Sequence, residues 1–129
     1  MLIRKPQQVD AQAMDMPGAS GVMMRLMVGR DDGAPHFAMR LFEVAPGGHT
    51  PQHAHNYEHQ VMIVSGDGQV LGGVGNLTIR PVTGGDVIFV PANETHQFRN
   101  PGQMPLTFLC LVPTTFDCGS NRCAATPGS

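Results

Sequence analysis

Residues 47–66, GGHTPQHAHNYEHQVMIVSG, decide the fold of this chain. The segment follows the Pro-Gly-Gly turn with His53, His55 and His59, and it ends in an apolar run that predicts a strand. Side chains two positions apart on an extended chain share one face, so His53 and His55 point to the same side. His59 keeps the same alternation, provided that residues 56–57 do not bulge. The segment therefore predicts a strand that presents imidazoles on one face.

Short apolar runs recur along the rest of the chain, separated by turn-forming residues. The 129 residues include 16 Gly and 11 Pro, a composition that argues against a helical bundle. Asp67-Gly68 predicts a tight hairpin turn after one of these runs. Strands this short and this regularly spaced favour an all-β sandwich or barrel. The expected strands are residues 22–28, 37–44, 60–64, 77–82, 86–90, 96–99 and 106–112.

A chain of this length fits one domain. We expect a partly ordered N-terminal segment (residues 1–20), a β-barrel (residues 21–114) and a flexible C-terminal tail (residues 115–129), because the tail has almost no apolar side chains to bury. Cys118 and Cys123 lie in this tail, and their spacing assigns them to no site.

Charge and hydropathy exclude several classes of partner. The net charge is −2 and the eight basic residues are scattered, so we expect no nucleic-acid partner. No apolar run approaches the length of a membrane-spanning helix, and the first ten residues lack the apolar core of a secretory signal. These features predict a cytoplasmic protein that acts on a small molecule away from membranes. A small sheet protein with exposed strand faces is also expected to form a homodimer.

A fourth histidine, His96, follows a predicted strand that ends at Pro91. An antiparallel barrel can bring it opposite His53, His55 and His59, although some forty residues separate them in the sequence. Neutral imidazoles are ligands of Zn, Cu, Fe and Ni, and also of Mn where coordination positions stay open. The four histidines are therefore candidate ligands of one divalent metal ion.

Two segments resemble the motifs of the cupin superfamily. The first has the pattern G-x5-HxH-x3-H-x6-G, with His59 where most cupins carry glutamate; the second has the pattern G-x5-P-x4-H-x3-N, with Asn93 where glycine is usual. The first comprises Gly47, His53, His55, His59 and Gly66, and the second Gly85, Pro91, His96 and Asn100. Beyond these motifs, residues 20–113 resemble the small four-histidine cupins that bind manganese.

This resemblance implies a jelly-roll β-barrel with one metal ion per chain. It implies His53, His55, His59 and His96 as ligands and manganese as the metal, whereas ligand chemistry alone leaves Fe²⁺, Ni²⁺, Cu²⁺ and Zn²⁺ open. A one-residue slip in register would make Glu58 the ligand in place of His59. Four neutral ligands leave the full +2 charge on the ion, which makes it a stronger Lewis acid than a site with a carboxylate.

Three functions are compatible with these features. The first is a Mn- or Fe-dependent oxidoreductase that activates O₂ or peroxide, with oxidative C=C cleavage of a small apolar or aromatic substrate as an example. The second is a non-redox isomerase or lyase acting on a small sugar acid or keto acid. The third is a ligand-binding module without catalysis. The resemblance to manganese cupins favours the first.

Strand alternation predicts the walls of the substrate pocket. Phe98 shares a face with His96, and Phe108 and Cys110 share a face of the last strand. Arg40 interrupts an apolar strand, where it binds a substrate carboxylate or enolate, pairs with Glu43 or Asp86, or is exposed at a sheet edge. Arg40 and Glu58 are the candidate catalytic residues beside the metal ligands.

Overall fold

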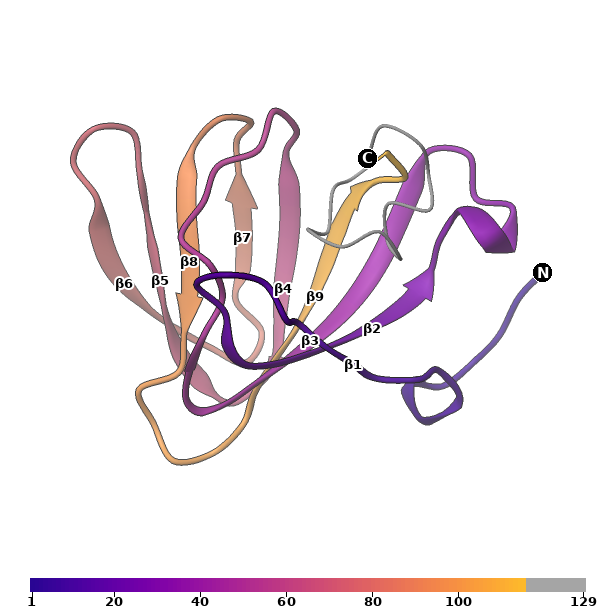
Figure 1. Cartoon of the computed structure of the whole chain (residues 1–129), viewed down its shortest axis with the longest axis horizontal. Helices are drawn as coiled ribbons and strands as arrows, with labels where there is room; N and C mark the ends of the chain where they lie inside the picture. The colour runs from indigo at the N-terminus through magenta and orange to yellow at the C-terminus, as the bar shows by residue number, and fades with distance from the viewer. Residues whose placement is uncertain (116–129) are drawn as a thin grey trace.

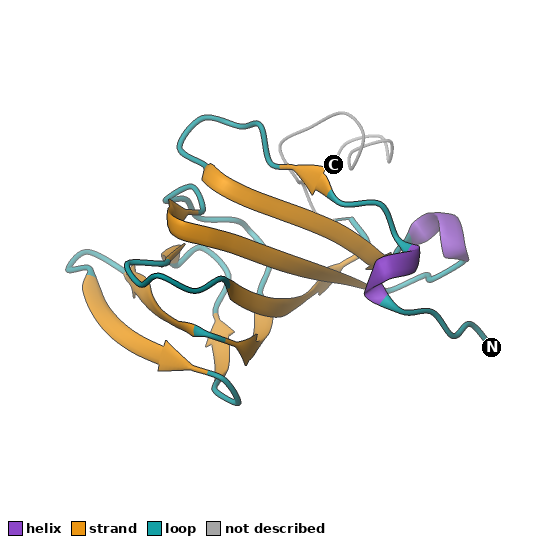
Figure 2. Ribbon diagram, turned by 90° about the horizontal axis from the view of Figure 1, so that it is seen from below, coloured by secondary structure: helices purple, strands orange, loops and turns teal. Residues whose placement is uncertain are grey.

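The structure is a computed structural model, and it describes residues 1–115. These residues form a β domain with two short 3-10 helices, Pro6–Gln8 and Arg30–Asp32 (Figure 2). Within the described residues, no helix is long and apolar enough to cross a membrane. The strands are β1 (Gln12–Ala13), β2 (Ser20–Val28), β3 (Phe37–His49), β4 (His59–Ser65), β5 (Asp67–Gly73), β6 (Thr78–Thr83), β7 (Val87–Val90), β8 (Thr95–Arg99) and β9 (Leu106–Pro113).

The strands form one strongly curled sheet in the order β6-β5-β8-β3-β9-β4-β7, and β2 and β1 extend it from β3. In the described residues, β3 joins β8 through a single pair, His49 and Arg99. The sheet therefore bends at this point, and β5, β6 and β8 form one side while β2, β3, β4 and β9 form the other (Figure 1). This architecture confirms the predicted all-β, single-domain jelly-roll barrel.

The core lies between the two sides of the curled sheet. Residues of β9 alternate strictly between the core and the outer face, so that Phe108, Cys110 and Val112 are buried while Leu111 is exposed. The Phe108 ring stacks on two other aromatic rings, with centroid distances of 4.5 Å to Phe98 and 5.1 Å to Phe42. The predicted inward faces of β8 and β9 are thus confirmed, and aromatic side chains fill the centre of the barrel.

The predicted hairpin at Asp67-Gly68 is wrong. These two residues begin β5, which pairs with β6 and β8, whereas β4 pairs with β7 and β9. The chain instead turns at Gly66, which has a φ of 91° and lies so close to Pro105 that an added Cβ would be 2.3 Å from its carbonyl oxygen. Only glycine fits there. The sequence pattern does not predict β5 as a strand, because its glycines are typical of turns.

The N-terminal segment packs against the barrel. Residues of β1 pair with Met23 and Met24 of β2, and Arg4 forms an ion pair of 3.0 Å with Asp32. Part of the predicted tail lies outside the described residues, and so do Cys118 and Cys123.

The outer face of β4, β7 and β9 is apolar and exposed. Its exposed apolar side chains are those of Met62, Val64, Val87, Phe89 and Leu111. The register places Met62 beside Val87, whereas Phe89 lies beside the polar Gln60. This surface is where the predicted homodimer would form, and dimerisation stays a prediction.

Candidate metal centre

Two of the predicted ligands are joined directly through their backbones. The amide of His53 donates to the carbonyl of His96 (3.2 Å), and the amide of His96 donates to the carbonyl of His53 (2.9 Å). The same pairing continues at Thr50, whose amide donates to the Phe98 carbonyl and whose Oγ1 accepts from the Phe98 amide, both at 2.9 Å. Backbone pairing between the β3–β4 loop and β8 therefore brings these distant histidines together.

His55 lies in the loop between β3 and β4 and is held from two sides. Its carbonyl accepts a hydrogen bond of 2.6 Å from the amide of Asn93, and its ring stacks on Tyr57 with an interplanar angle of 5°. Asn93 has a φ of 68°, a left-handed conformation that asparagine tolerates better than most residues. This explains how asparagine occupies a position where the motif usually has glycine.

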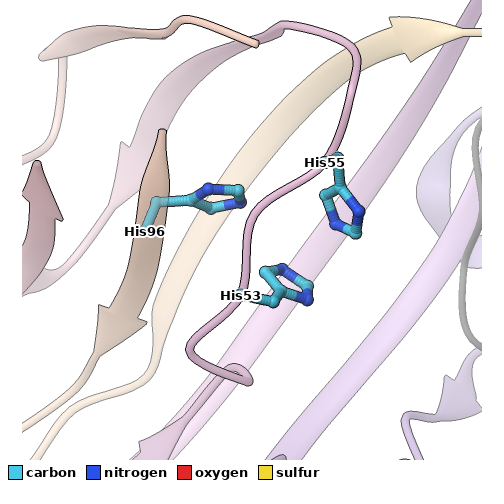
Figure 3. A group of neighbouring side chains, drawn as sticks. All are labelled: His53, His55 and His96. Atoms are coloured by element: carbon cyan, nitrogen blue, oxygen red, sulfur yellow. The ribbon is translucent and has the colours of Figure 1, made fainter. Parts of the chain in front are cut away.

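The rings of His53, His55 and His96 point toward one another inside the barrel (Figure 3). A nitrogen from each lies within 4.8 Å of a nitrogen of the other two, and the centroid distances are 4.2 Å for His53–His55 and 4.9 Å for His53–His96. Three convergent imidazoles are a donor set that divalent transition metals bind. These three side chains form the candidate metal centre.

His59 lies next to this group without belonging to it. Its ring centroid is 4.8 Å from that of His96 and 5.2 Å from that of His55. Its Nδ1 is 3.3 Å from Cys110 Sγ, while its Nε2 is buried and has no hydrogen-bond partner among residues 1–115. A buried nitrogen without a partner is costly, and a metal ion at the centre would supply one. The donor set therefore fits a metal, with His59 as a candidate fourth ligand.

The electrostatics of the site keep its buried imidazoles neutral. Burial is the main cause that lowers the pKa of His59 to about 2, and electrostatic repulsion from His96 and Arg40 adds to it. Burial also lowers the pKa of His96, whose Nδ1 lies 3.0 Å from the Glu94 carbonyl. That contact places the proton on Nδ1 and leaves Nε2 with a free lone pair. Neutral imidazole is the form that binds metal.

The histidines line a small cavity of about 40 Å³. The predicted pocket residues Phe98, Phe108 and Cys110 lie in its wall, together with Phe42. A cavity of this size holds roughly three water molecules. It admits a ligand of a few heavy atoms or one end of a larger ligand.

The N-terminal segment supplies two residues that sequence analysis missed. Met14 and Met16 line the cavity beside Pro51, where the N-terminal segment passes the β3–β4 loop (Figure 1). No periodicity in residues 1–20 indicated this position. The segment therefore contributes to the cavity as well as to the sheet.

Arg40 lies on the inner face of β3 and lines the cavity. Its side chain is buried, with an exposed fraction of 5%. Of the open alternatives, exposure at a sheet edge is wrong. Glu43 is exposed on the opposite face of the same strand, and Asp86 is exposed in a turn where its carboxylate accepts a hydrogen bond from the Thr83 amide.

Glu58 does not reach the cavity. Its carboxylate is exposed and accepts a hydrogen bond of 3.1 Å from Gln60 Nε2. The alternation of the chain turns Glu58 outward where His59 turns inward. The predicted catalytic role of Glu58, and its alternative role as a metal ligand, do not fit this placement.

The pattern of ligands and the barrel agree with a family comparison. The model of the Cupin domain matches residues 40–112, which is more than half of the chain and includes the four predicted ligand histidines. The chain belongs to the cupin family. The cupin motifs identified in the sequence thus correspond to the β3–β4 and β7–β8 segments that carry the candidate metal centre.

Relatives of this cupin have different activities. The chain is 39% identical over 74 residues to 1-methylthio-D-xylulose 5-phosphate methylsulfurylase of Rhodospirillum rubrum. The aligned residues make up 57% of this chain and 46% of that protein. The match thus spans about half of that curated relative. The polyketide cyclase RemF from Streptomyces resistomycificus is 30% identical, with a TM-score of 0.77 over 88% of this chain and 80% of its own. A cupin-2 domain from Rhodospirillum rubrum is 31% identical, with a TM-score of 0.76 over 91% and 76% of the two chains.

Proposed function

We propose that this cupin is a metal-dependent enzyme that acts on a small carbonyl compound by non-redox chemistry. The observation that carries the proposal is the convergence of His53, His55 and His96 inside the barrel. His59 would be the fourth ligand, because its buried Nε2 faces no other partner in residues 1–115. Manganese is the proposed metal, with Fe²⁺, Ni²⁺, Cu²⁺ and Zn²⁺ as the alternatives that imidazole ligands also accept.

When bound, the ion would supply Lewis-acid polarisation of a substrate oxygen. The protein side chains would hold and shield that oxygen. Phe98 and Phe108 restrict the space beside the histidines to a small cavity. Electrostatic interactions are stronger in such a cavity than in bulk water. The stacked rings also hold the cavity wall rigid.

The names of two relatives support chemistry at a carbonyl group. One relative is named as a polyketide cyclase and the other for a xylulose phosphate. Polyketides and ketose phosphates both contain carbonyl groups with neighbouring C–H bonds, whose proton becomes more acidic when the carbonyl is polarised. The class of reaction we propose is therefore proton exchange or elimination next to a carbonyl. Water would accept the proton that leaves the α-carbon, because no acidic side chain of residues 1–115 lines the cavity.

An O₂- or peroxide-dependent oxidoreductase is the second candidate. The aromatic wall made by Phe42, Phe98 and Phe108 favours it, because a small apolar or aromatic substrate would pack against these rings. This oxidative reaction needs no acid or base from the protein, which agrees with the position of Glu58 outside the cavity.

The first experiment measures metal content. Protein purified without chelator or nickel column is analysed for all transition metals. We expect about one ion per chain in the wild type and far less in His53→Ala. The control is His36→Ala, whose metal content should equal that of the wild type because His36 is exposed. The metal-loaded protein is then incubated in D₂O without oxygen with small ketones and keto acids. Solvent deuterium at the α-carbon supports the carbonyl function; consumption of O₂ or peroxide with an aryl alkene supports the second candidate. A bound metal without either activity would indicate a binding module, and absence of metal would overturn the proposal.

A further inference from the structure

Arg40 places a permanent positive charge in the wall of the cavity. Its guanidinium lies 4.9 Å from the centre of the Phe42 ring, and its Nη2 is 3.5 Å from Cys110 Sγ. Arginine stays protonated in proteins. Its long side chain is fixed by β3, which is paired with β2 and β9 on both sides at this position.

Arg40 is also close to the candidate metal ligands. Cys110 Sγ contacts both the Arg40 guanidinium (3.5 Å) and His59 Nδ1 (3.3 Å), so the thiol lies between the cation and the imidazole. A metal ion at the histidines would place a second positive centre on the same small cavity.

The charges along the cavity wall are therefore of one sign. Within the described part of the chain, none of the residues that line the cavity is acidic. A ligand that enters this space meets a guanidinium with several N–H donors on one side and the metal centre on the other. Planar guanidinium groups match carboxylates and related oxygen anions.

We propose that Arg40 binds an anionic oxygen of the ligand, a carboxylate or an enolate, and thereby selects small acids for this site. The inference rests on the proposed function, because it assumes that the ligand also reaches the metal centre. It makes Arg40 the residue that determines ligand charge. A 2-hydroxy or 2-oxo acid would present its carboxylate to Arg40 and its second oxygen group to the metal centre.

The test compares glycolate with glycolamide, its neutral analogue with the same number of heavy atoms. Binding of both to the Zn²⁺-loaded protein is measured by calorimetry for wild type, Arg40→Met and Arg40→Lys, with Arg99→Met as the control at an exposed arginine. Because a hydrogen bond to a charged group contributes more than a neutral one, we expect Arg40→Met to weaken glycolate binding by about 10- to 100-fold. Glycolamide binding should change little, and Arg40→Lys should recover part of the loss. An unchanged ratio of glycolate to glycolamide affinity in Arg40→Met would overturn the proposal.

A second measurement on the wild type covers the case in which Arg40→Met does not fold. The Nε–H resonance of Arg40 is followed by ¹H–¹⁵N NMR and assigned with Arg40→Lys. We expect it to shift on addition of glycolate and not of glycolamide; no shift with glycolate overturns the proposal. The titration is repeated on metal-free protein. If zinc analysis finds no bound metal, the proposed function fails, yet the NMR titration still decides whether Arg40 binds the anion.

Discussion

The unpartnered nitrogen of His59 leads to a prediction in which one substitution has opposite effects with and without metal. His59→Leu replaces a buried imidazole by an apolar side chain of similar volume. In the metal-free protein the change removes a buried Nε2 that has no hydrogen-bond partner in residues 1–115. In the metal-bound protein it removes a candidate ligand. The variant should therefore be more stable than wild type without metal and less stable with it.

The magnitudes follow from burial and linkage. A buried polar group without a partner costs about 1–3 kcal/mol, and the hydrogen bond between His59 Nδ1 and Cys110 Sγ, at 3.3 Å, is a weak one for leucine to remove. We therefore expect His59→Leu to stabilise the metal-free protein by about 1 kcal/mol, or roughly 4 °C in Tm for a domain of this size. Metal at about 100 times its Kd stabilises the wild type by about 2.7 kcal/mol. A tenfold weaker site in the variant reduces that gain by about 1.4 kcal/mol.

The assay is thermal unfolding followed by circular dichroism, first in chelator and then with added Mn²⁺ or Zn²⁺. His36→Leu is the matched control, because His36 is exposed outside the cavity. His53→Leu should lose most of the metal-dependent rise in Tm, because His53 belongs to the group of three. The wild-type and His59→Leu curves should change order when the metal is added.

Two results would refute this reasoning. If His59→Leu unfolds well below wild type in chelator, its Nε2 is not a destabilising group. If metal raises the Tm of His59→Leu as much as that of wild type, His59 is no ligand, and the centre consists of the three histidines alone.

Three further predictions concern other parts of the molecule. Burial raises the pKa of the Cys110 thiol. In a Cys118→Ser/Cys123→Ser variant we therefore expect no alkylation of Cys110 by iodoacetamide at pH 8 until the protein is unfolded. Rapid labelling of the native protein would contradict this. The buried side chain of Asn100 makes three hydrogen bonds, two to the carbonyls of Val44 and Met104 and one from the amide of Gly102. Asn100→Ala should therefore lower the free energy of unfolding, measured by urea titration, by about 3 kcal/mol. A loss near zero would be inconsistent with those bonds. We also predict that sedimentation finds a homodimer in the wild type and a monomer for Phe89→Glu, which places a charge in the apolar outer face; a dimer in both would exclude that face.

Local pattern was sufficient to predict the barrel and to single out candidate metal ligands. Apolar alternation along β9 indicated which side chains face inward, because the period of a strand is fixed by its backbone geometry. His53 and His55 fit the first cupin motif, and His96 fits the second, in which Asn93 stands where glycine is usual. Each motif joins residues close together in the sequence, so it could be recognised there.

Long-range pairing determined what the sequence left open. β5 was missed because its glycines are typical of turns, yet they lie in a strand that is held between β6 and β8. The choice between Glu58 and His59 depended on strand phase after the loop, and only the pairing of β4 with β7 and β9 set it. A one-residue change of phase exchanges the two faces of a strand, so sequence alone could not settle which side chain points inward.

The sequence by itself determined the fold class, the cupin motifs and a set of histidines that are candidate metal ligands, because these depend on local periodicity and fixed spacing. The tertiary structure decided that Arg40 is buried in the wall of the cavity and that Met14 and Met16 help to line it. Both results depend on which distant strands and segments meet. Burial and the sign of charge around a cavity are properties of the packed chain, and no local pattern encodes them.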